Sequence, residues 1–157
     1  MSKITWFYRK VLYDLTRSPK ASIRVWAMQK LGFNIGKDVY IGPYLTMTVG
    51  YADKSIKVNL HDRVAFGPNV TLVLATHPNN SRLRAYIKYP PRQITIGEDS
   101  WLGANVVIMP NITIGKCCII GAGAVVTHDV PDYAIMAGVP AKQIGSVDKE
   151  RLDSLKR

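Results

Sequence analysis

Aliphatic residues recur at every sixth position over the second half of the chain. The uninterrupted series consists of Ile96, Leu102, Ile108, Ile114, Ile120 and Val126. A period of six cannot remain on one face of an α-helix, because the helix turns once every 3.6 residues. Short strands joined by tight corners keep the period, with each aliphatic side chain directed into an interior shared by stacked repeats. The pattern therefore predicts a β-helix, and six matches in one register argue against chance periodicity.

Shorter runs extend the repeat towards the N-terminus. Three earlier residues share the phase of the series, namely Leu60, Phe66 and Leu72. A run that starts at Ile35 is displaced by one residue, and the repeat breaks over 47–56 and at a long loop over 78–94. Glycine follows the aliphatic residue in several hexads, and we expect it to permit the corner between strands. We expect one β-helix domain over 35–144.

The two ends of the chain carry helical patterns instead. In the segment 1–34, one helical face is apolar and consists of Ile4, Phe7, Val11 and Leu15. Ser18 and Pro19 predict the N-cap and the first residue of a second helix, and Gly32 predicts its end. Charged and apolar residues alternate over 145–157, which predicts a short closing helix.

Positive charge is concentrated in the N-terminal segment. The whole sequence has 21 basic and 11 acidic side chains, a net charge of +10. Seven of the basic residues and one of the acids precede position 35, so this segment holds seven minus one, or +6. We favour a helical cap over the first open coil, with its charges in water. The alternative, compatible with the first, is an anchor on an anionic membrane through Trp6, Phe7, Tyr8 and Trp26.

The rest of the composition is that of an ordinary globular domain, with 47% hydrophobic and 20% charged residues. No apolar run is long enough to span a bilayer, and the N-terminus does not have the form of a signal peptide. Cys117 and Cys118 are adjacent, so we expect one to face inward and one outward, without a bridge between them. These features favour a cytoplasmic location, and no nucleic-acid-binding motif accompanies the basic charge.

Three stretches of the repeat carry a further signal: IGEDSWLG at 96–103, IGAGAVVT at 120–127 and AGVPAK at 137–142. They resemble the hexapeptide-repeat acyltransferases, in particular the galactoside, maltose and surface-polysaccharide O-acetyltransferases, and the similarity covers 32–144. The resemblance implies a left-handed parallel β-helix with three hexapeptides per coil. It also implies a homotrimer with active sites between subunits, acetyl-coenzyme A as the co-substrate, and no metal.

His77 is the candidate catalytic residue, at the end of a hexad and the start of the long loop. An alcohol is a weak nucleophile at neutral pH, so acyl transfer from a thioester needs a positioned base, and histidine titrates near neutral pH. In the resembling family the histidine before this loop is the base, and His77 matches it. The alternative is a purely structural histidine. The three histidines are scattered, which argues against a zinc site, and a covalent route through Cys117 or Cys118 is disfavoured.

The resemblance also assigns residues that contact the ligands. The positions matched to coenzyme A contacts are Ala104, Ala122, Thr127, His128 and Lys142. Small side chains at the first two suit an extended ligand that lies against the backbone. Asp53, Arg84 and Tyr86 are candidates for the acceptor site; the alternatives are that the loop cations provide only solubility and that Tyr86 only anchors the loop. The family pattern is not met at Gly145, where a basic residue is common, or near Met47, where relatives place an asparagine.

The expected acceptor is a carbohydrate hydroxyl, in a surface polysaccharide or its lipid-linked precursor. The basic N-terminal segment favours this choice, because such glycans are made at the cytoplasmic face of the membrane. A bare sugar, a nucleotide sugar and an antibiotic remain open as acceptors. The rival function is a non-catalytic β-helix that acts as a scaffold or as an assembly module on a membrane surface.

Overall fold

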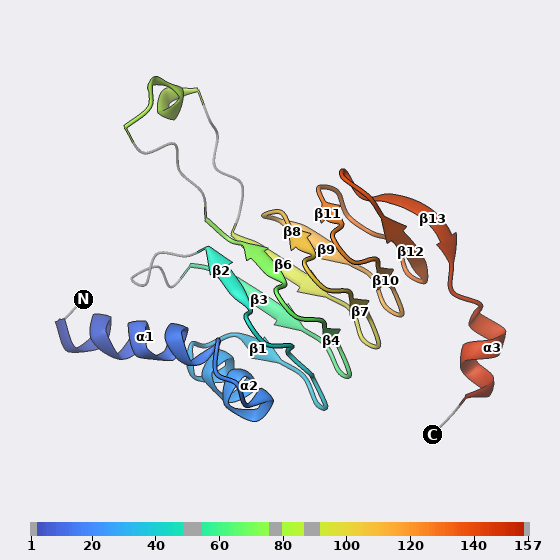
Figure 1. The fold of residues 1–157 in the computed structure, drawn as a ribbon, viewed down its shortest axis with the longest axis horizontal. Coiled ribbons are helices and arrows are strands. Elements are labelled where there is room, and N and C mark those ends of the chain that lie inside the picture. Colours follow the sequence, from blue (N-terminus) through green and yellow to red (C-terminus); the bar gives the residue numbers. More distant parts are fainter. Residues whose placement is uncertain (1–2, 49–54, 76–79, 87–91, 156–157) are drawn as a thin grey trace.

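The computed structural model describes residues 3–48, 55–75, 80–86 and 92–155, and it is mainly β with three α-helices (Figure 1). The helices are α1 (Lys3–Leu15), α2 (Ala21–Lys30) and α3 (Lys149–Ser154), with a 3-10 helix, η1, at Arg82–Ala85. α1 and α2 lie at one end of the strands and α3 lies at the other. The predicted helices at both ends of the chain are therefore present.

The strands form three sheets, which we name sheets A, B and C. Sheet A contains β1 (Asn34–Ile35), β3 (Lys57–Leu60), β6 (Gln93–Ile96) and β9 (Ile112–Ile114). Sheet B contains β4 (Ala65–Phe66), β7 (Trp101–Leu102), β10 (Ile119–Ile120), β12 (Ala134–Ala137) and β13 (Lys142–Ser146). Sheet C contains β2 (Thr46–Thr48), β5 (Thr71–Val73), β8 (Val107–Ile108) and β11 (Val125–Val126). Neighbouring strands are parallel, except that β13 runs antiparallel to β12.

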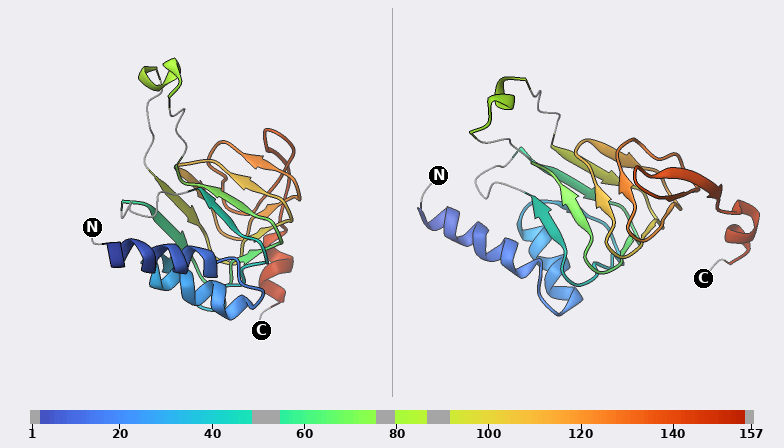
Figure 2. Two further views of the ribbon diagram at one scale, coloured as in Figure 1. Left: turned by 60° about the vertical axis from the view of Figure 1, so that its left-hand side comes forward. Right: turned by 45° about the horizontal axis from the view of Figure 1, so that its top comes forward.

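The chain visits the three sheets in the repeating order A, B, C, so that successive coils stack on one another (Figure 2). In the uninterrupted part, Thr95 pairs with Thr113, and Val107 pairs with Val125. Each partner lies three times six positions further along the chain (113 minus 95, and 125 minus 107), so one coil contains three hexads. This agrees with the predicted number of hexapeptides per coil; the hand of the coil stays a prediction.

Two insertions interrupt the stack at the same edge. Asn34 pairs with Asn59, and Asn59 pairs with Thr95. The first pair is separated by 59 minus 34, or 25 residues, which is one coil of 18 residues plus seven inserted residues. The second pair is separated by 95 minus 59, or 36 residues, which is one coil plus 18 inserted residues. Because the steps from sheet A to B and from B to C stay at one hexad, both insertions fall between sheet C and the next strand of sheet A. The single extra residue of the first insertion explains the displaced phase of the first run.

The aliphatic series forms the core, as the period predicts. Each of its members, Ile96, Leu102, Ile108, Ile114, Ile120 and Val126, is at most 1% exposed. They join one continuous hydrophobic cluster with the residues of the earlier coils, Leu60, Phe66 and Leu72 among them. The interior is thus a single column of apolar side chains that runs the length of the stack.

The hexad glycines have a different role from the one expected. Gly97 does not have a positive φ, and a Cβ there would lie only 2.6 Å from the carbonyl carbon of Gly115 in the next coil. In most hexads the left-handed conformation belongs instead to the third residue after the inward-facing one, and the non-glycine residues that adopt it are Asp38, Tyr44, Arg63, Asn69, Asp99, Asn105, Asn111, Cys117 and Tyr133. The expectation that glycine supplies the corner is wrong at such positions; glycine permits the close approach of neighbouring coils.

α2 caps the first coil. Ala27 and Met28 are fully buried, and the buried Arg24 donates from Nε to the carbonyl oxygen of Ile41 at 2.7 Å. Its Nη1 donates to the carbonyl oxygens of Ser18 and Pro19 at 2.5 and 2.9 Å. α2 begins two residues later than predicted, because the N-cap is Lys20, whose backbone N–H donates to the Ser18 hydroxyl oxygen. The predicted end at Gly32 is confirmed by its φ of 90° after the C-cap.

Candidate functional site

Most of the predicted site residues lie along the two edges of sheet C. We call the corner where the chain passes from sheet C to sheet A the C–A edge; its described residues are 48, 73–75, 109–110 and 127–128. The corner from sheet B to sheet C is the B–C edge, at 43–44, 68–69, 104–105 and 122–123. The corner from sheet A to sheet B is the A–B edge, at 37–38, 62–63, 98–99, 116–117 and 132–133.

The C–A edge is the edge from which both insertions leave. On it, the Ala75 backbone N–H donates to the carbonyl oxygen of Thr48 at 2.7 Å, and the Thr48 hydroxyl oxygen accepts from the Leu74 N–H at 3.1 Å. These bonds join the chain before the first insertion to the chain before the second. His77 and Asp53 belong to the two insertions and lie outside the described residues. The predictions for these two residues are therefore not tested.

Thr127 and His128 lie on the same C–A edge, in a later coil. The Thr127 Oγ1 and the His128 Nδ1 are 2.9 Å apart, a hydrogen bond whose direction depends on the imidazole tautomer. Thr127 is half-buried and His128 is exposed. The pair thus presents an oriented imidazole and a hydroxyl to the outside, which suits contact with a polar ligand.

Ala104 and Ala122 lie in register on the B–C edge. Their column is continued by backbone bonds: the Gly123 N–H donates to the Ala104 carbonyl oxygen at 2.8 Å, and the Asn105 N–H donates to that of Pro68 at 2.9 Å. Ala104 is half-buried and Ala122 is exposed. A ligand laid along this column meets methyl groups and backbone, so the residues fit the predicted contact with an extended arm.

The turn before Lys142 extends the B–C edge. The Val125 N–H donates to the Gly138 carbonyl oxygen at 3.1 Å, and the Ala141 N–H donates to the Val125 carbonyl oxygen at 2.8 Å. The exposed Lys142 follows this turn at the start of β13. The five predicted coenzyme A residues therefore separate into two groups, one on each edge of sheet C. Ala122 and Thr127 are five residues apart, at most about 18 Å along an extended chain.

A hollow of about 490 Å³ continues the B–C edge over the earlier coils. It is lined by Arg17, Tyr44, Thr46, Asn69, Thr71 and Asn105. The Arg17 guanidinium reaches the Thr46 hydroxyl oxygen at 3.5 Å. These residues were not predicted from the sequence, where the one signal for them is the pair of asparagines, Asn69 and Asn105, in the corner positions after Pro68 and Ala104. The hollow adds amides, hydroxyls and one cation to the predicted small residues.

Arg84 and Tyr86 are not brought to either edge by the described part of the chain. Arg84 lies in η1 and Tyr86 directly follows it. Both side chains are exposed, and Tyr86 is 85% exposed. η1 stands apart from the sheets in Figures 1 and 2, on the second insertion. The Ser81 hydroxyl oxygen caps it by accepting from the Leu83 N–H at 3.2 Å. Their predicted contact with the acceptor stays a prediction.

The two cysteines are both buried, which corrects the expectation that one faces outward. Cys118 is part of the core cluster, and its thiol donates to the Pro131 carbonyl oxygen at 3.1 Å. Cys117 occupies a left-handed corner on the A–B edge, 9% exposed. Burial raises the pKa of both thiols, and at Cys117 the carboxylates of Asp99 and Glu98 raise it further. A raised pKa disfavours the thiolate, in keeping with the prediction against a covalent route.

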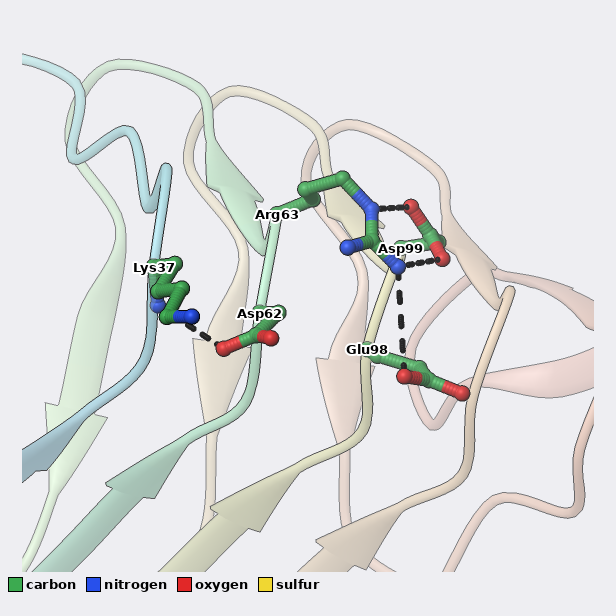
Figure 3. Close-up of polar contacts among 5 residues, drawn as sticks. All are labelled: Lys37, Asp62, Arg63, Glu98 and Asp99. Atoms are coloured by element: carbon green, nitrogen blue, oxygen red, sulfur yellow. Dashed lines mark hydrogen bonds and ion pairs between the residues drawn. The ribbon is translucent and has the colours of Figure 1, made fainter. Parts of the chain in front are cut away.

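The A–B edge carries a ladder of polar contacts between coils (Figure 3). The Arg63 guanidinium donates to both carboxylate oxygens of Asp99, at 2.6 and 2.7 Å, and lies 3.9 Å from Glu98. In the coil before, the Asp62 carboxylate accepts from the Lys37 backbone N–H at 2.8 Å. The hydrogen bond from Arg63 lowers the pKa of Asp99. These pairs join neighbouring coils, so we interpret the A–B edge as structural.

The described residues contain neither a cluster of metal ligands nor a membrane-spanning helix. No group of three or more histidine, cysteine, aspartate or glutamate side chains in these ranges is placed to hold a metal ion. Within the same ranges, no helix has the length and apolar character required to cross a membrane.

Comparison with known proteins identifies the family. Residues 93–128 match the family described as bacterial transferase hexapeptide (six repeats). Over 125 residues the chain is 36% identical to galactoside O-acetyltransferase of Escherichia coli (strain K12), an alignment that covers 78% of this chain and 61% of that protein. Over 149 residues it is 35% identical to putative acetyltransferase SAR2635 of Staphylococcus aureus (strain MRSA252), with 90% of this chain and 71% of that protein covered.

The fold is shared with solved structures as well. A galactoside acetyltransferase in complex with coenzyme A matches 97% of this chain and 86% of its own, at 28% identity and a TM-score of 0.63. The chain spans between about half and three fifths of the length of several curated relatives. The cyclic order of the sheets and these relatives support a β-helix. The predicted resemblance is confirmed: the chain belongs to the hexapeptide-repeat acetyltransferase family.

Proposed function

We propose that this protein transfers an acetyl group from acetyl-coenzyme A to a hydroxyl of a carbohydrate acceptor, with His77 as the general base. One observation carries the proposal. Both insertions, and with them His77 and Asp53 in the sequence, leave the stack at the same edge that presents the Thr127–His128 pair. Relatives named galactoside O-acetyltransferase support the choice of a sugar hydroxyl.

The proposed reaction is a direct transfer within a ternary complex. His77 accepts the proton of the acceptor hydroxyl while the oxygen attacks the thioester carbon. Collapse of the tetrahedral intermediate breaks the carbon–sulfur bond, and the departing thiolate takes the proton from the imidazolium. The products are an O-acetyl ester and coenzyme A. Backbone N–H groups stabilise the oxyanion in this scheme.

Acetyl-coenzyme A is proposed to lie along the B–C edge. The column of Ala104 and Ala122 leaves room for the pantetheine arm, and Lys142 provides a cation for a phosphate at the end of that column. Thr127 and His128, on the opposite edge of the same sheet, are proposed to contact the cofactor of the same or a neighbouring subunit. A solved relative that holds coenzyme A supports this choice of co-substrate.

We also propose that the protein is a homotrimer with its sites between subunits. The outer row of sheet B is apolar, and it runs through Tyr40, Ala65, Trp101, Ile119 and Ile135 in register. Trp101 remains 53% exposed in the single chain. In contrast, the outer row of sheet A is polar, with Asn59 donating to Thr95 at 3.1 Å. An apolar row of this kind is suited to burial against another copy.

The acceptor is proposed to be a surface polysaccharide or its lipid-linked precursor, modified at the cytoplasmic face of the membrane. The support is the charge of the N-terminal segment, which is +6 by seven basic residues minus one acidic. Arg84 and Tyr86, on the exposed η1, are proposed to contact this long acceptor.

The proposal is tested by following thiol release from acetyl-coenzyme A with a panel of mono- and oligosaccharides. The expected result is release that depends on a carbohydrate, with a mass increase of one acetyl group in the product. Loss of that group in mild base identifies an ester and excludes an amide. Thiol release that no carbohydrate or surface glycan stimulates would contradict the proposal and favour the non-catalytic scaffold.

A further inference from the structure

α1 turns its apolar face away from the protein. Three of the four residues of the predicted apolar face are exposed, by 82% at Ile4, 63% at Phe7 and 39% at Val11, and the adjoining Tyr8 is 52% exposed; the fourth, Leu15, is half-buried in the last turn. The buried residues are Leu12 and Tyr13 near the end of the helix and Thr16 directly after it. Figures 1 and 2 show the first turns of α1 extending beyond the sheets and α2. The helix is therefore attached at one end and presents an uncovered apolar face at the other.

The two faces of α1 are separate. At 100° per residue, Ile4, Phe7, Tyr8 and Val11 fall within a sector of roughly 100°, which we call the α1 stripe. Leu12 and Thr16 lie on the neighbouring side of the helix, towards the body of the protein. The packing of α1 thus does not use the α1 stripe. A water-exposed stripe of four large apolar side chains on one short helix calls for a partner.

The charge around the α1 stripe indicates what that partner is. Lys3, Arg9, Lys10 and Arg17 belong to the same segment, and Asp14 is the one acid before position 35. Lys10 pairs with Asp14 at 3.0 Å, which leaves the segment strongly positive. A second copy of this chain carries the same net charge of +10 and is a poor complement. An anionic lipid surface offers both apolar depth and negative phosphates.

We propose that α1 binds the surface of an anionic bilayer, with the α1 stripe among the acyl chains and headgroups. Tyr8, a member of the α1 stripe, has the amphipathic ring that settles at this depth, and it is exposed on α1. The net positive charge of the N-terminal segment attracts α1 to the lipid phosphates. The helix lies in the plane of the interface and does not span the membrane. This inference does not depend on the acetyl-transfer reaction.

The test is sedimentation of the unmodified protein with vesicles of equal parts phosphatidylglycerol and phosphatidylcholine. We expect binding to these vesicles, little binding to pure phosphatidylcholine, and release between about 0.1 M and about 1 M salt, where the Debye length falls from about 10 Å to about 3 Å. The double variant Ile4→Glu/Phe7→Glu should lower the partition coefficient about tenfold or more, since it places charge in the apolar stripe.

The matched control is Ile144→Glu, the same substitution at an isoleucine that is 69% exposed in β13 at the opposite end of the stack. Its partition coefficient should remain within about twofold of the unmodified protein. Thiol release with a soluble acceptor should be the same in all three proteins, so failure of lipid binding and failure of acetyl transfer are distinguished. Circular dichroism checks that the variants fold.

Two outcomes overturn the inference. The first is an unmodified protein that stays in the supernatant with anionic vesicles at low salt. The second is equal vesicle binding by the double variant and the unmodified protein. If the double variant instead changes the molecular mass in light scattering while no protein binds vesicles, the α1 stripe is a contact between copies and the lipid proposal is wrong.

Discussion

The A–B edge and the C–A edge are built from the same hexads, yet they differ in what the chain does there. The A–B edge turns five times without an inserted residue, and its corners are joined by contacts such as the one between Arg63 and Asp99. The C–A edge releases two insertions, one of a hexad plus one residue and one of three hexads. Because the other edges stay in register, the insertions do not disturb the core. One edge therefore holds the scaffold constant while the other is free to carry recognition and chemistry.

The largest difference between the edges is expected for their histidines. Replacing His77, which belongs to the second insertion, with alanine should lower kcat by about 10²- to 10⁴-fold, the usual contribution of a general base. His61→Ala, at an exposed position directly before the A–B edge, should change kcat by less than about twofold. Thiol-release kinetics and thermal unfolding are measured together. Equal activity of the His77 variant and the unmodified protein would remove the proposed role of the C–A edge.

The next effect concerns the close approach of coils at the A–B edge. Gly97→Ala should destabilise the protein by about 1–3 kcal/mol, because the new Cβ would lie 2.6 Å from the backbone of Gly115. Gly123→Ala is the comparison, because it has a φ of 71° but open space around it, and it should cost roughly 1–2 kcal/mol. Urea unfolding at one protein concentration measures both. A neutral Gly97→Ala would show that the coils are able to separate without loss.

A smaller effect is expected from the hydroxyl at the C–A edge. Thr127→Val removes the hydrogen bond to His128 and should raise the KM for acetyl-coenzyme A by about two- to tenfold, with kcat nearly unchanged. Thr113→Val is the control, because Thr113 is an exposed threonine on the outer face of sheet A. An unchanged KM in the Thr127 variant, measured at saturating acceptor, would place the cofactor elsewhere.

The smallest effect is expected from the ion pair of the A–B edge. Arg63 lowers the pKa of Asp99, so the pair stabilises the protein above the usual pKa of aspartate, about 3.9, and the contribution is lost as the pH falls through the lowered value. Arg63→Gln should therefore reduce the melting temperature slightly at pH 7, and the difference should shrink in acid. A difference that grows as the pH falls would show that the pair acts in another way.

Much of the scaffold was predictable because the period of six is a direct consequence of its geometry. The core residues and the helices at both ends follow from the pattern, whereas three hexads per coil was expected only from the resemblance to the family. The positions of the left-handed corner residues could not be predicted from the positions of glycine. Asp99, Asn105 and Cys117 adopt that conformation, whereas Gly97 permits the close approach of neighbouring coils. β13 was also missed, since nothing in its sequence marks the reversal that lets it pair antiparallel with β12.

The candidate site was predictable only in part. The motif residues on both edges of sheet C were named from the sequence, but their division between two edges required the register of the strands. Arg17 and Asn105 line one hollow although more than half of the chain separates them, and no local sequence pattern predicts that they lie close together. The stripe on α1 was visible in the sequence, whereas its outward direction depends on where α2 meets the first coil.

The pairing distance of three hexads has a consequence for how such a molecule changes over generations. A tandem duplication or loss of the codons for three whole hexads adds or removes one coil and leaves the inward-facing side chains of all other coils aligned. Loss of a single codon between Ile94 and Ile114 instead turns the downstream aliphatic residues out of the core. Selection is thus expected to add or remove whole coils, whereas the insertions at the C–A edge are able to vary in length.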